Sequence, residues 1–174
     1  MTPDQLRRFL GRTKPFAIQT SNGGYVPVHR EITQEDLIKH LRGEVTLGTY
    51  VIREDGLITF ASIDIDGRVG EDMGPYEQLA YYVLELFPEF DRCVEWSGRR
   101  GYHVWIFLEQ PEVPRFVREL ILSRLKTNGV SPKIEVFPKQ HVTTGKGLGN
   151  LIKLPNGKHQ QGGWAKVLRW ENGN

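Results

Sequence analysis

The sequence contains a single cysteine, Cys93, and two methionines among its 174 residues. One cysteine excludes an internal disulfide framework and a cysteine-rich zinc site, so a reducing cytoplasm is the expected location. The apolar runs are short, and none approaches the roughly 20 residues that span a bilayer. The opening stretch, MTPDQLRRFLGRTKPF, contains no apolar segment of the kind found in secretory signals. These features argue against a membrane protein and a disulfide-rich secreted protein.

The remaining composition is that of an ordinary globular protein. Charged residues make up 25% of the chain, hydrophobic residues 39% and aromatic residues 10%. This apolar content can bury one core and is too high for intrinsic disorder. The length corresponds to about one domain at the usual ~100–200 residues per domain.

The net charge of +2 conceals an asymmetry along the chain. Residues 1–94 carry 10 Lys and Arg against 15 Asp and Glu, whereas residues 95–174 carry 13 against 6. Between residues 125 and 170 there are eight basic residues and one acid, Glu135. Such a stretch favours a polyanionic partner, nucleic acid or a nucleoside triphosphate. On charge alone, a solvated basic surface explains it equally well.

Apolar periodicity and turn residues predict a mixture of helices and strands. An Asp-Gly pair at 55–56 is a strong hairpin signal, so residues 46–53 and 57–66 are expected to pair across it. Thr33 with Asp36 resembles a capping box and predicts a helix start. Helices are predicted over residues 3–12, 33–43, 75–87 and 114–127, and further strands over residues 16–20, 92–96, 102–108, 133–137 and 164–170.

From residue 57 onward the order is strand, helix, strand, strand, helix, strand. This order is typical of a split βαβ core of the ferredoxin-like or RRM-like kind. We therefore expect an α+β fold with helices against one face of a sheet. The chain is expected to form one domain, 1–174, in which an N-terminal helical or αβ module, 1–45, packs on a core formed by residues 46–170.

Two aspartates end an otherwise apolar predicted strand. Residues two apart in a strand point to the same face, so Asp64 and Asp66 share one face while Ile63 and Ile65 face the core. The two carboxylates start about 7 Å apart along the backbone and repel each other unless a positive charge lies between them. All-oxygen ligands suit magnesium or manganese. Two solvated acids at a strand end are the alternative.

A second candidate site is the string Ser-Gly-Arg-Arg-Gly-Tyr-His at residues 97–103. Glycines let the backbone approach a phosphate closely, and two arginines lie in the same turn. Alternation along the following strand places His103 on one face with Trp105 and Phe107. His103 can therefore hydrogen-bond a phosphate or a 3′-hydroxyl, although a lone histidine is often structural. The candidate nucleotide-binding residues of this string are Ser97, Arg99, Arg100 and His103.

A later acid and a glycine-rich loop complete the candidates. Glu135 alternates with its apolar neighbours and so faces away from the core. It suits a third metal ligand and, equally, a salt-bridge partner of Lys133 or Lys139. The loop over residues 145–155, Gly-Lys-Gly-Leu-Gly-Asn-Leu-Ile-Lys-Leu-Pro, can cradle phosphates. It is neither a Walker A loop nor a dinucleotide-binding fingerprint, and a flexible surface loop explains it equally well.

Together and in this order, the motifs resemble the catalytic domain of the archaeo-eukaryotic primase superfamily. They are most similar to the branch of TOTE conflict-system and CRISPR-associated primase-polymerases. The Asp-x-Asp strand is similar to the superfamily's first motif, the turn that leads to His103 to its second, and Glu135 to its third. Strings at residues 135–140 and 147–155, and the segment 41–50, are also similar to that branch, so the resemblance covers about residues 25–160.

The resemblance implies the archaeo-eukaryotic primase fold, an RRM-like split βαβ palm with an N-terminal helical or αβ module. It implies three metal ligands, Asp64, Asp66 and Glu135. It implies that His103 contacts the phosphates of the incoming nucleotide and belongs with those three to the catalytic set. The chain has one residue more between serine and histidine than much of that branch, which leaves both arginines of the turn as candidates. By position, the resemblance adds three residues to the nucleotide or template site: Lys139, Asn150 and Lys153.

The activity that the resemblance implies is that of a DNA primase and DNA-directed polymerase. Two divalent cations, Mg²⁺ or Mn²⁺, would assist transfer of a nucleotide from an NTP or dNTP to a 3′-hydroxyl, including de novo initiation. The implied partners are nucleoside triphosphates, a single-stranded DNA template and a primer. Further domains of a longer chain, a helicase or a CRISPR-associated domain, are also implied, and a membrane is not.

Three other functions remain open at this stage. A non-catalytic RRM-like nucleic-acid-binding module is one, because residues 100–107 partly fit the RRM consensus. His103 stands there in place of a small residue, and Val104 replaces the central stacking aromatic. A metal-dependent nuclease would use the same carboxylates and shorten its substrate. A repair or end-joining polymerase would extend chains without starting them.

Overall fold

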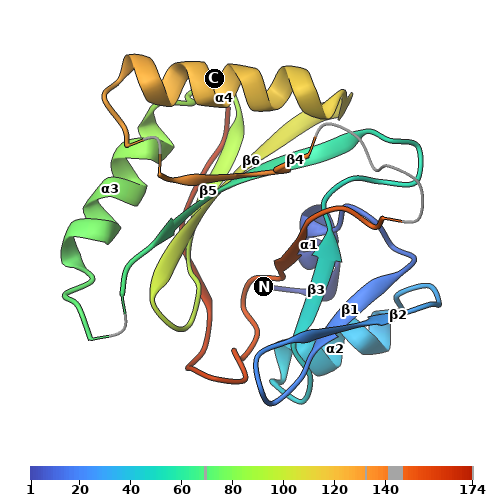
Figure 1. Ribbon diagram of the computed structural model, residues 1–174. Helices are drawn as coiled ribbons and strands as arrows, with labels where there is room; N and C mark the ends of the chain where they lie inside the picture. Colours follow the sequence, from blue (N-terminus) through green and yellow to red (C-terminus); the bar gives the residue numbers. More distant parts are fainter. Residues whose placement is uncertain (69, 132, 141–146, 174) are drawn as a thin grey trace.

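The computed structural model describes residues 1–68, 70–131, 133–140 and 147–173. Within these ranges the strands form two antiparallel sheets, one of five strands and one of four. Figure 1 shows the smaller sheet at the lower right and two long helices, α3 and α4, on the outer side of the larger one. No described helix is long and apolar enough to cross a membrane.

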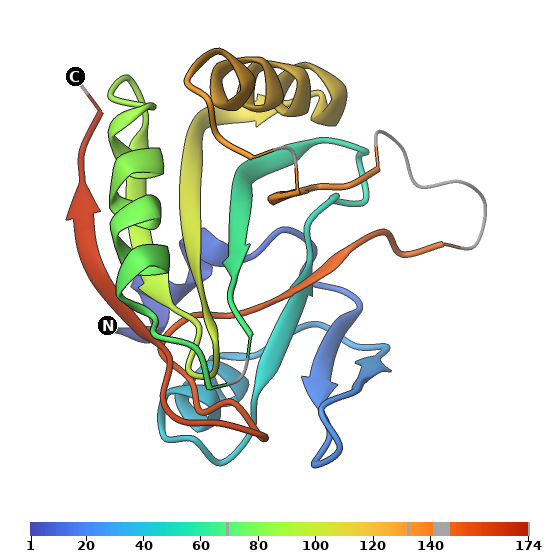
Figure 2. The ribbon, with the colours of Figure 1, turned by 60° about the vertical axis from the view of Figure 1, so that its left-hand side comes forward.

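The larger sheet has the strand order β7-β4-β6-β5-β9. The chain runs from β4 through α3 to β5 and β6, and then through α4 to β7. This is the split βαβ order expected from the sequence, so the α+β prediction is confirmed. Figure 2 shows β9, in red, along the outer edge of this sheet. The elements are β4 Ile58–Asp66, α3 Gly74–Glu85, β5 Asp91–Trp96, β6 Gly101–Glu112, α4 Pro114–Thr127, β7 Glu135–Phe137 and β9 Lys166–Glu171.

The smaller sheet has the order β2-β1-β3-β8 and joins strands from distant parts of the chain. Ile18 in β1 lies opposite Leu47 in β3, and Tyr50 in β3 lies opposite Leu151 in β8. This pairing brings the segment after residue 150 back to the N-terminal strands. Strand β2 was not predicted. The elements are α1 Pro3–Leu6, the 3-10 helix η1 Arg7–Phe9, β1 Phe16–Gln19, β2 Tyr25–Val28, α2 Gln34–Leu41, β3 Leu47–Tyr50 and β8 Leu151–Lys153.

The hairpin predicted around residues 55–56 is wrong. The turn itself forms, because the Arg53 N–H donates to the Leu57 carbonyl at 2.9 Å and Gly56 has a φ of 82°. Beyond the turn the two segments separate, and β3 and β4 join different sheets. β4 pairs with β6 on one side and β7 on the other, which buries an apolar strand that a two-stranded hairpin would leave exposed.

Two predicted helix starts are confirmed. Thr33 and Asp36 form a reciprocal capping box in which the Thr33 hydroxyl accepts from the Asp36 N–H at 3.2 Å. In return, the Asp36 carboxylate accepts from the Thr33 N–H at 2.8 Å. Helix α4 begins at Pro114, whose fixed φ suits a first helical turn, and spans the residues expected from the sequence.

Both faces of the larger sheet are buried. Helices α3 and α4 cover the face to which Ile63 and Ile65 point. On the opposite face, Phe9 of η1 packs edge-on against Trp105, with ring centroids 4.9 Å apart. Phe60 lies against the same indole at 5.2 Å. Because His103 shares this face with Trp105, the predicted polar site residues lie next to a buried aromatic cluster.

His40 of α2 is buried where the smaller sheet meets the loop after β8. Its Nδ1 accepts the Leu47 N–H at 3.0 Å, so Nε2 carries the proton and donates to the Pro155 carbonyl at 2.9 Å. Both ring nitrogens are thus satisfied in the neutral form. Burial lowers the pKa of His40 to about 4.

This histidine is expected to make the fold acid-labile. Its stabilising contribution is complete above the usual pKa of 6.5 and is lost as the pH falls towards about 4, because the unfolded chain then binds the proton more readily. We expect the free energy of unfolding to fall by about 3 kcal/mol across this window. Urea unfolding at both ends of the window measures it. His40→Gln should show a shallower pH dependence, and an unchanged dependence would contradict this account.

Candidate active site

Four ionisable residues form a row across the larger sheet. Asp64 in β4 lies directly opposite Glu135 in β7 and, on its other side, opposite His103 in β6. His103 is in turn opposite Glu95 in β5. Directly opposite residues point to the same face, so one face carries three acids and an imidazole side by side. Asp66 follows on that face, as the alternation along the strand predicts.

Glu95 is the centre of a buried hydrogen-bond network. Its side chain is 0% exposed. Its Oε2 accepts from His103 Nδ1 at 2.9 Å and from the Trp105 indole N–H at 2.8 Å. Its Oε1 accepts from the Lys153 ammonium at 3.0 Å. Lys153 belongs to β8, so this network joins the two sheets at the site.

The network sets the charge states of its members. Burial by itself raises the pKa of Glu95, but Lys153 and His103 outweigh it and lower that pKa from 4.5 to about 2. Burial by itself lowers the pKa of His103, but Glu95 and Asp64 outweigh it and raise that pKa above 6.5. Since the carboxylate can only accept, His103 Nδ1 carries a proton and donates to it. The ring is therefore fixed with Nε2 turned towards Asp64.

Asp64 is a buried carboxylate with an unsatisfied oxygen. Its Oδ1 lies 3.7 Å from His103 Nε2 and accepts no hydrogen bond from the residues that the structure describes. Burial raises the pKa of Asp64; His103 opposes this rise, and Asp66 and Glu135 add to it. Buried polar atoms without partners are rare, and each calls for an explanation such as an ion or a reaction partner.

The other two predicted metal ligands are each held by a basic side chain. Asp66 accepts from Arg100 at 3.0 Å, and Glu135 pairs with Lys139 at 2.6 Å. In the described ranges no three His, Cys, Asp or Glu side chains are arranged to hold a metal ion. The donor chemistry nonetheless fits a divalent cation, because the unsatisfied Asp64 oxygen lies beside further carboxylate oxygens.

A cavity of about 240 Å³ adjoins His103 between the two sheets. The smaller sheet and the loop after β8 contribute residues that sequence analysis did not single out for the site: Gln19, Tyr25 and His159. Acidic and basic groups thus face one space, as a cation with a polyphosphate requires. Most of the predicted site residues line this cavity: Asp64, Asp66, Ser97, Arg99, Arg100, His103 and Lys153.

Three predicted residues lie outside the lining of this cavity. Glu135 lines a second cavity of about 370 Å³, which it shares with Asp64 and Asp66. The Lys139 N–H donates to Asn150 Oδ1 at 2.7 Å, so Asn150 joins the segment after β7 to the start of β8. Outside the described residues lie two members of the predicted glycine-rich loop, Gly145 and Lys146.

Sequence analysis missed Glu95 and Tyr25. Glu95 stood in a predicted strand, and the available signal was an acid between two apolar residues, Val94 and Trp96, next to the glycine turn. Tyr25 belongs to the unpredicted strand β2. Burial raises the pKa of Tyr25, and the charge of Glu95 raises it further, so its hydroxyl stays protonated beside the cavity.

Comparisons with known proteins agree with this architecture. The family model described as TOTE conflict system, Archaeo-Eukaryotic Primase domain, matches residues 6–166. No curated protein sequence matches the chain. Among solved structures, the archaeo-eukaryotic primase domain of the cyanophage S-2L primase-polymerase has a similar fold. The TM-score is 0.51 and the identity 14%, over 90% of this chain and 80% of that one. The family match spans most of the sequence, and the chain therefore belongs to the archaeo-eukaryotic primase domain family of TOTE conflict systems.

Proposed function

We propose that this chain is a primase-polymerase that joins nucleotides to a 3′-hydroxyl on a single-stranded DNA template and starts primers de novo. Family membership supports primase- or polymerase-type nucleotidyl transfer in general. The observation that carries the proposal is the buried Asp64 oxygen, which has no donor within the described part of the chain, beside Asp66 and a fixed His103. Such an oxygen suits a cation that arrives with its substrate.

Three carboxylates would hold the cations: Asp64, Asp66 and Glu135. When bound, Mg²⁺ or Mn²⁺ supplies Lewis-acid activation of the hydroxyl and neutralises charge on the departing pyrophosphate. In the structure Arg100 pairs with Asp66, and Lys139 pairs with Glu135. Each contact uses one carboxylate oxygen and leaves the other oxygen for a cation, and a bound triphosphate would compete for both basic groups.

The remaining groups bind and orient the triphosphate. Glu95 holds a proton on His103 Nδ1 and raises the pKa of the ring, which favours the imidazolium form, and in that form Nε2 can donate to a phosphate oxygen. The arginines of the 97–101 turn line the same cavity and balance the triphosphate charge. In the transfer, a bond forms between the 3′-oxygen and the α-phosphorus. The bond to the bridging oxygen breaks, pyrophosphate takes the electron pair, and the hydroxyl proton passes to water.

The RRM-like binding-module alternative loses support in this fold. RRM modules stack bases on aromatic side chains of an open sheet face. Here that face is covered, because Phe9 packs on Trp105 and leaves the indole 0% exposed.

The deciding experiment is a gel assay on unprimed single-stranded DNA with all nucleoside triphosphates and either Mg²⁺ or Mn²⁺. New short products are expected from the wild type, because the site provides for both attacking and leaving groups. Growth of an added primer without unprimed products would restrict the function to extension. Shortened template without new products would replace the proposal with the nuclease alternative.

A further inference from the structure

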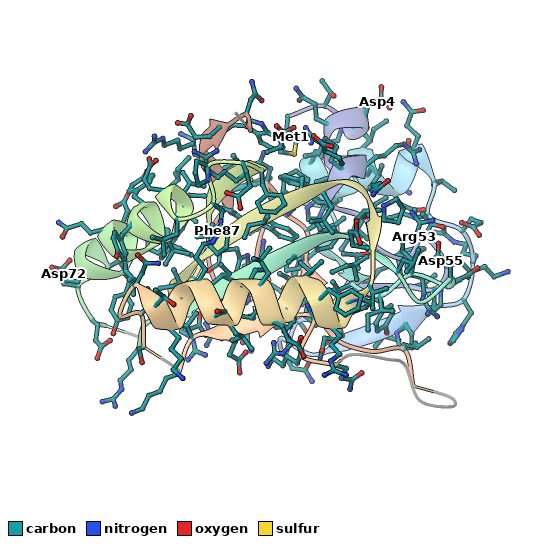
Figure 3. All side chains as sticks on the ribbon, turned by 90° about the horizontal axis from the view of Figure 1, so that it is seen from above. Met1, Asp4, Arg53, Asp55, Asp72 and Phe87 are labelled. Atoms are coloured by element: carbon teal, nitrogen blue, oxygen red, sulfur yellow. The ribbon has the colours of Figure 1, made fainter. Side chains whose placement is uncertain are left out.

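A cavity of about 510 Å³ lies apart from the proposed active site. It is formed by η1 and the residues after it, by the turn before β4, and by the far part of β6. Figure 3 labels Arg53 and Asp55 of that turn on the side of the molecule opposite Asp72, which follows the Asp66 end of β4. The cavity is lined by four arginines: Arg7, Arg8, Arg12 and Arg53.

The lining of this cavity has a positive net charge, although the first 94 residues together have a negative one. Residues 1–94 carry 10 basic and 15 acidic residues, a net of −5. Four of those ten basic residues line the cavity against two acids, Glu54 and Asp55, which leaves the lining at +2. A cavity with an excess of positive groups in its lining attracts an anionic ligand.

Two of the arginines, Arg7 and Arg12, have a long salt bridge or none among the described residues. Arg7 lies 3.9 Å from the exposed Asp4. Arg12 donates to the Ile52 and Arg53 carbonyls at 3.3 Å each, and across the described residues it forms no ion pair within 4.0 Å. Its guanidinium is thus positioned by backbone groups while its charge stays uncompensated.

The other two arginines, Arg8 and Arg53, form close salt bridges. Arg8 pairs with Asp91 at 2.8 Å and lies over the Phe107 ring at 4.8 Å. Arg53 pairs with Asp55 at 2.9 Å. The four lining arginines therefore come from two parts of the chain, η1 with the residues after it and the turn before β4, which meet at the contact between Arg12 and the Arg53 carbonyl.

We propose that this cavity binds the phosphate backbone of a single-stranded nucleic acid. Guanidinium groups match phosphate geometry, and four of them in the lining of one cavity suit a row of phosphates better than one small anion. Phe107 is 4% exposed and so offers bases no stacking surface. Binding is therefore expected to be independent of sequence. The identification of this strand as the template rests on the proposed function.

The distance to the carboxylates sets a length requirement. Thr59 lines the cavity and precedes Asp64 by five residues in β4. At about 3.3 Å per residue, the two sites are about 17 Å apart. That span corresponds to about five nucleotides at ~3.4 Å per nucleotide of a helical strand. The packing of Phe9 on Trp105 fills the sheet face between them.

The test measures the affinity of two labelled oligothymidylates by fluorescence anisotropy over a salt series in EDTA. One is about 20 nucleotides long, and the other, of about 2 nucleotides, is too short to present a row of phosphates or to reach the carboxylates. The variant Arg7→Ala/Arg53→Ala removes two lining charges outside the aromatic packing. Arg42→Ala/Arg115→Ala is the matched control, since both side chains are exposed, pair with a nearby acid and lie outside the lining.

For the long oligomer we expect the slope of log affinity against log salt to fall by about 1.4 in the test variant, from ~0.7 per lost phosphate contact. The control variant and the short oligomer should show no such fall. An unchanged slope with the long oligomer overturns the proposal. An equal fall in slope with the short oligomer also overturns it. So does competition by ATP that lowers the wild-type affinity for the long oligomer to that of the variant, because this would indicate a mononucleotide site.

Repeating the series with Asp66→Asn separates this inference from the proposed function. The arginine-dependent slope should persist in that variant, because the cavity does not include Asp66. If the wild type shows the arginine-dependent salt slope but transfers no nucleotides, only the proposed function is refuted. An intact transfer activity with no arginine-dependent slope would refute the cavity alone.

Discussion

Replacing Asp64 with asparagine is expected to abolish nucleotide transfer while leaving the fold at least as stable as in the wild type. The side chain is largely buried, no described residue donates to its Oδ1, and Asp66 and Glu135 repel its charge. Removing that charge relieves repulsion in the folded state, whereas transfer loses a cation ligand. Rates should fall at least about 100-fold, as when other electrostatic stabilisers of a transition state are removed.

Primer extension and thermal unfolding of the same preparation test both halves of this expectation. In the wild type, Mg²⁺ or Mn²⁺ should raise the melting temperature, because a ligand that binds only the folded state stabilises it. In Asp64→Asn that rise should disappear. Asp4→Asn is the control, since the Asp4 side chain is 85% exposed and lines neither cavity of the site. Extension by Asp64→Asn at near the wild-type rate would refute the carboxylate assignment.

Removing the carboxylate of Glu95 is expected to have the largest effect on stability. Glu95→Ala leaves the Lys153 ammonium and the His103 imidazolium buried without their partner. Breaking a buried pair in this way costs about 3–5 kcal/mol. Glu95→Gln retains an acceptor and the side-chain volume, so its loss in a urea unfolding series should be smaller.

A second pair of variants separates stability from positioning. Glu95→Gln/Lys153→Met removes both charges of the buried pair and should recover most of the stability lost in Glu95→Gln. It does not restore the charge that orients His103. We therefore expect kcat to stay low in the double variant. The ¹⁵N chemical shifts of the His103 ring should also report a lower pKa than in the wild type. Recovery of kcat together with stability would show that Glu95 has only a structural role.

Local sequence signals predicted much of the larger sheet. Alternation from Ile63 to Asp66 placed two carboxylates on one face, and the register confirms that shared face. Pro114 and the Thr33 capping box marked helix starts correctly, because caps depend on a few neighbouring residues. The hairpin at 55–56 failed for the opposite reason. The turn is local, but strand pairing is decided by which distant strands bury the apolar faces.

The sequence by itself determined the chemical inventory of this protein: paired aspartates, a histidine after a glycine turn, a later acid and a basic C-terminal half. These depend on residue type and on short spacings that adjacent dihedral angles control. Only the tertiary structure decided which groups meet. Glu95 became the partner of His103 through the pairing of β5 with β6, and Lys153 reached it because β8 joins the smaller sheet. The arginine cavity likewise brings together residues about forty positions apart, such as Arg12 and Arg53. Burial of the apolar faces of the two sheets produces this proximity, and no local sequence pattern encodes it.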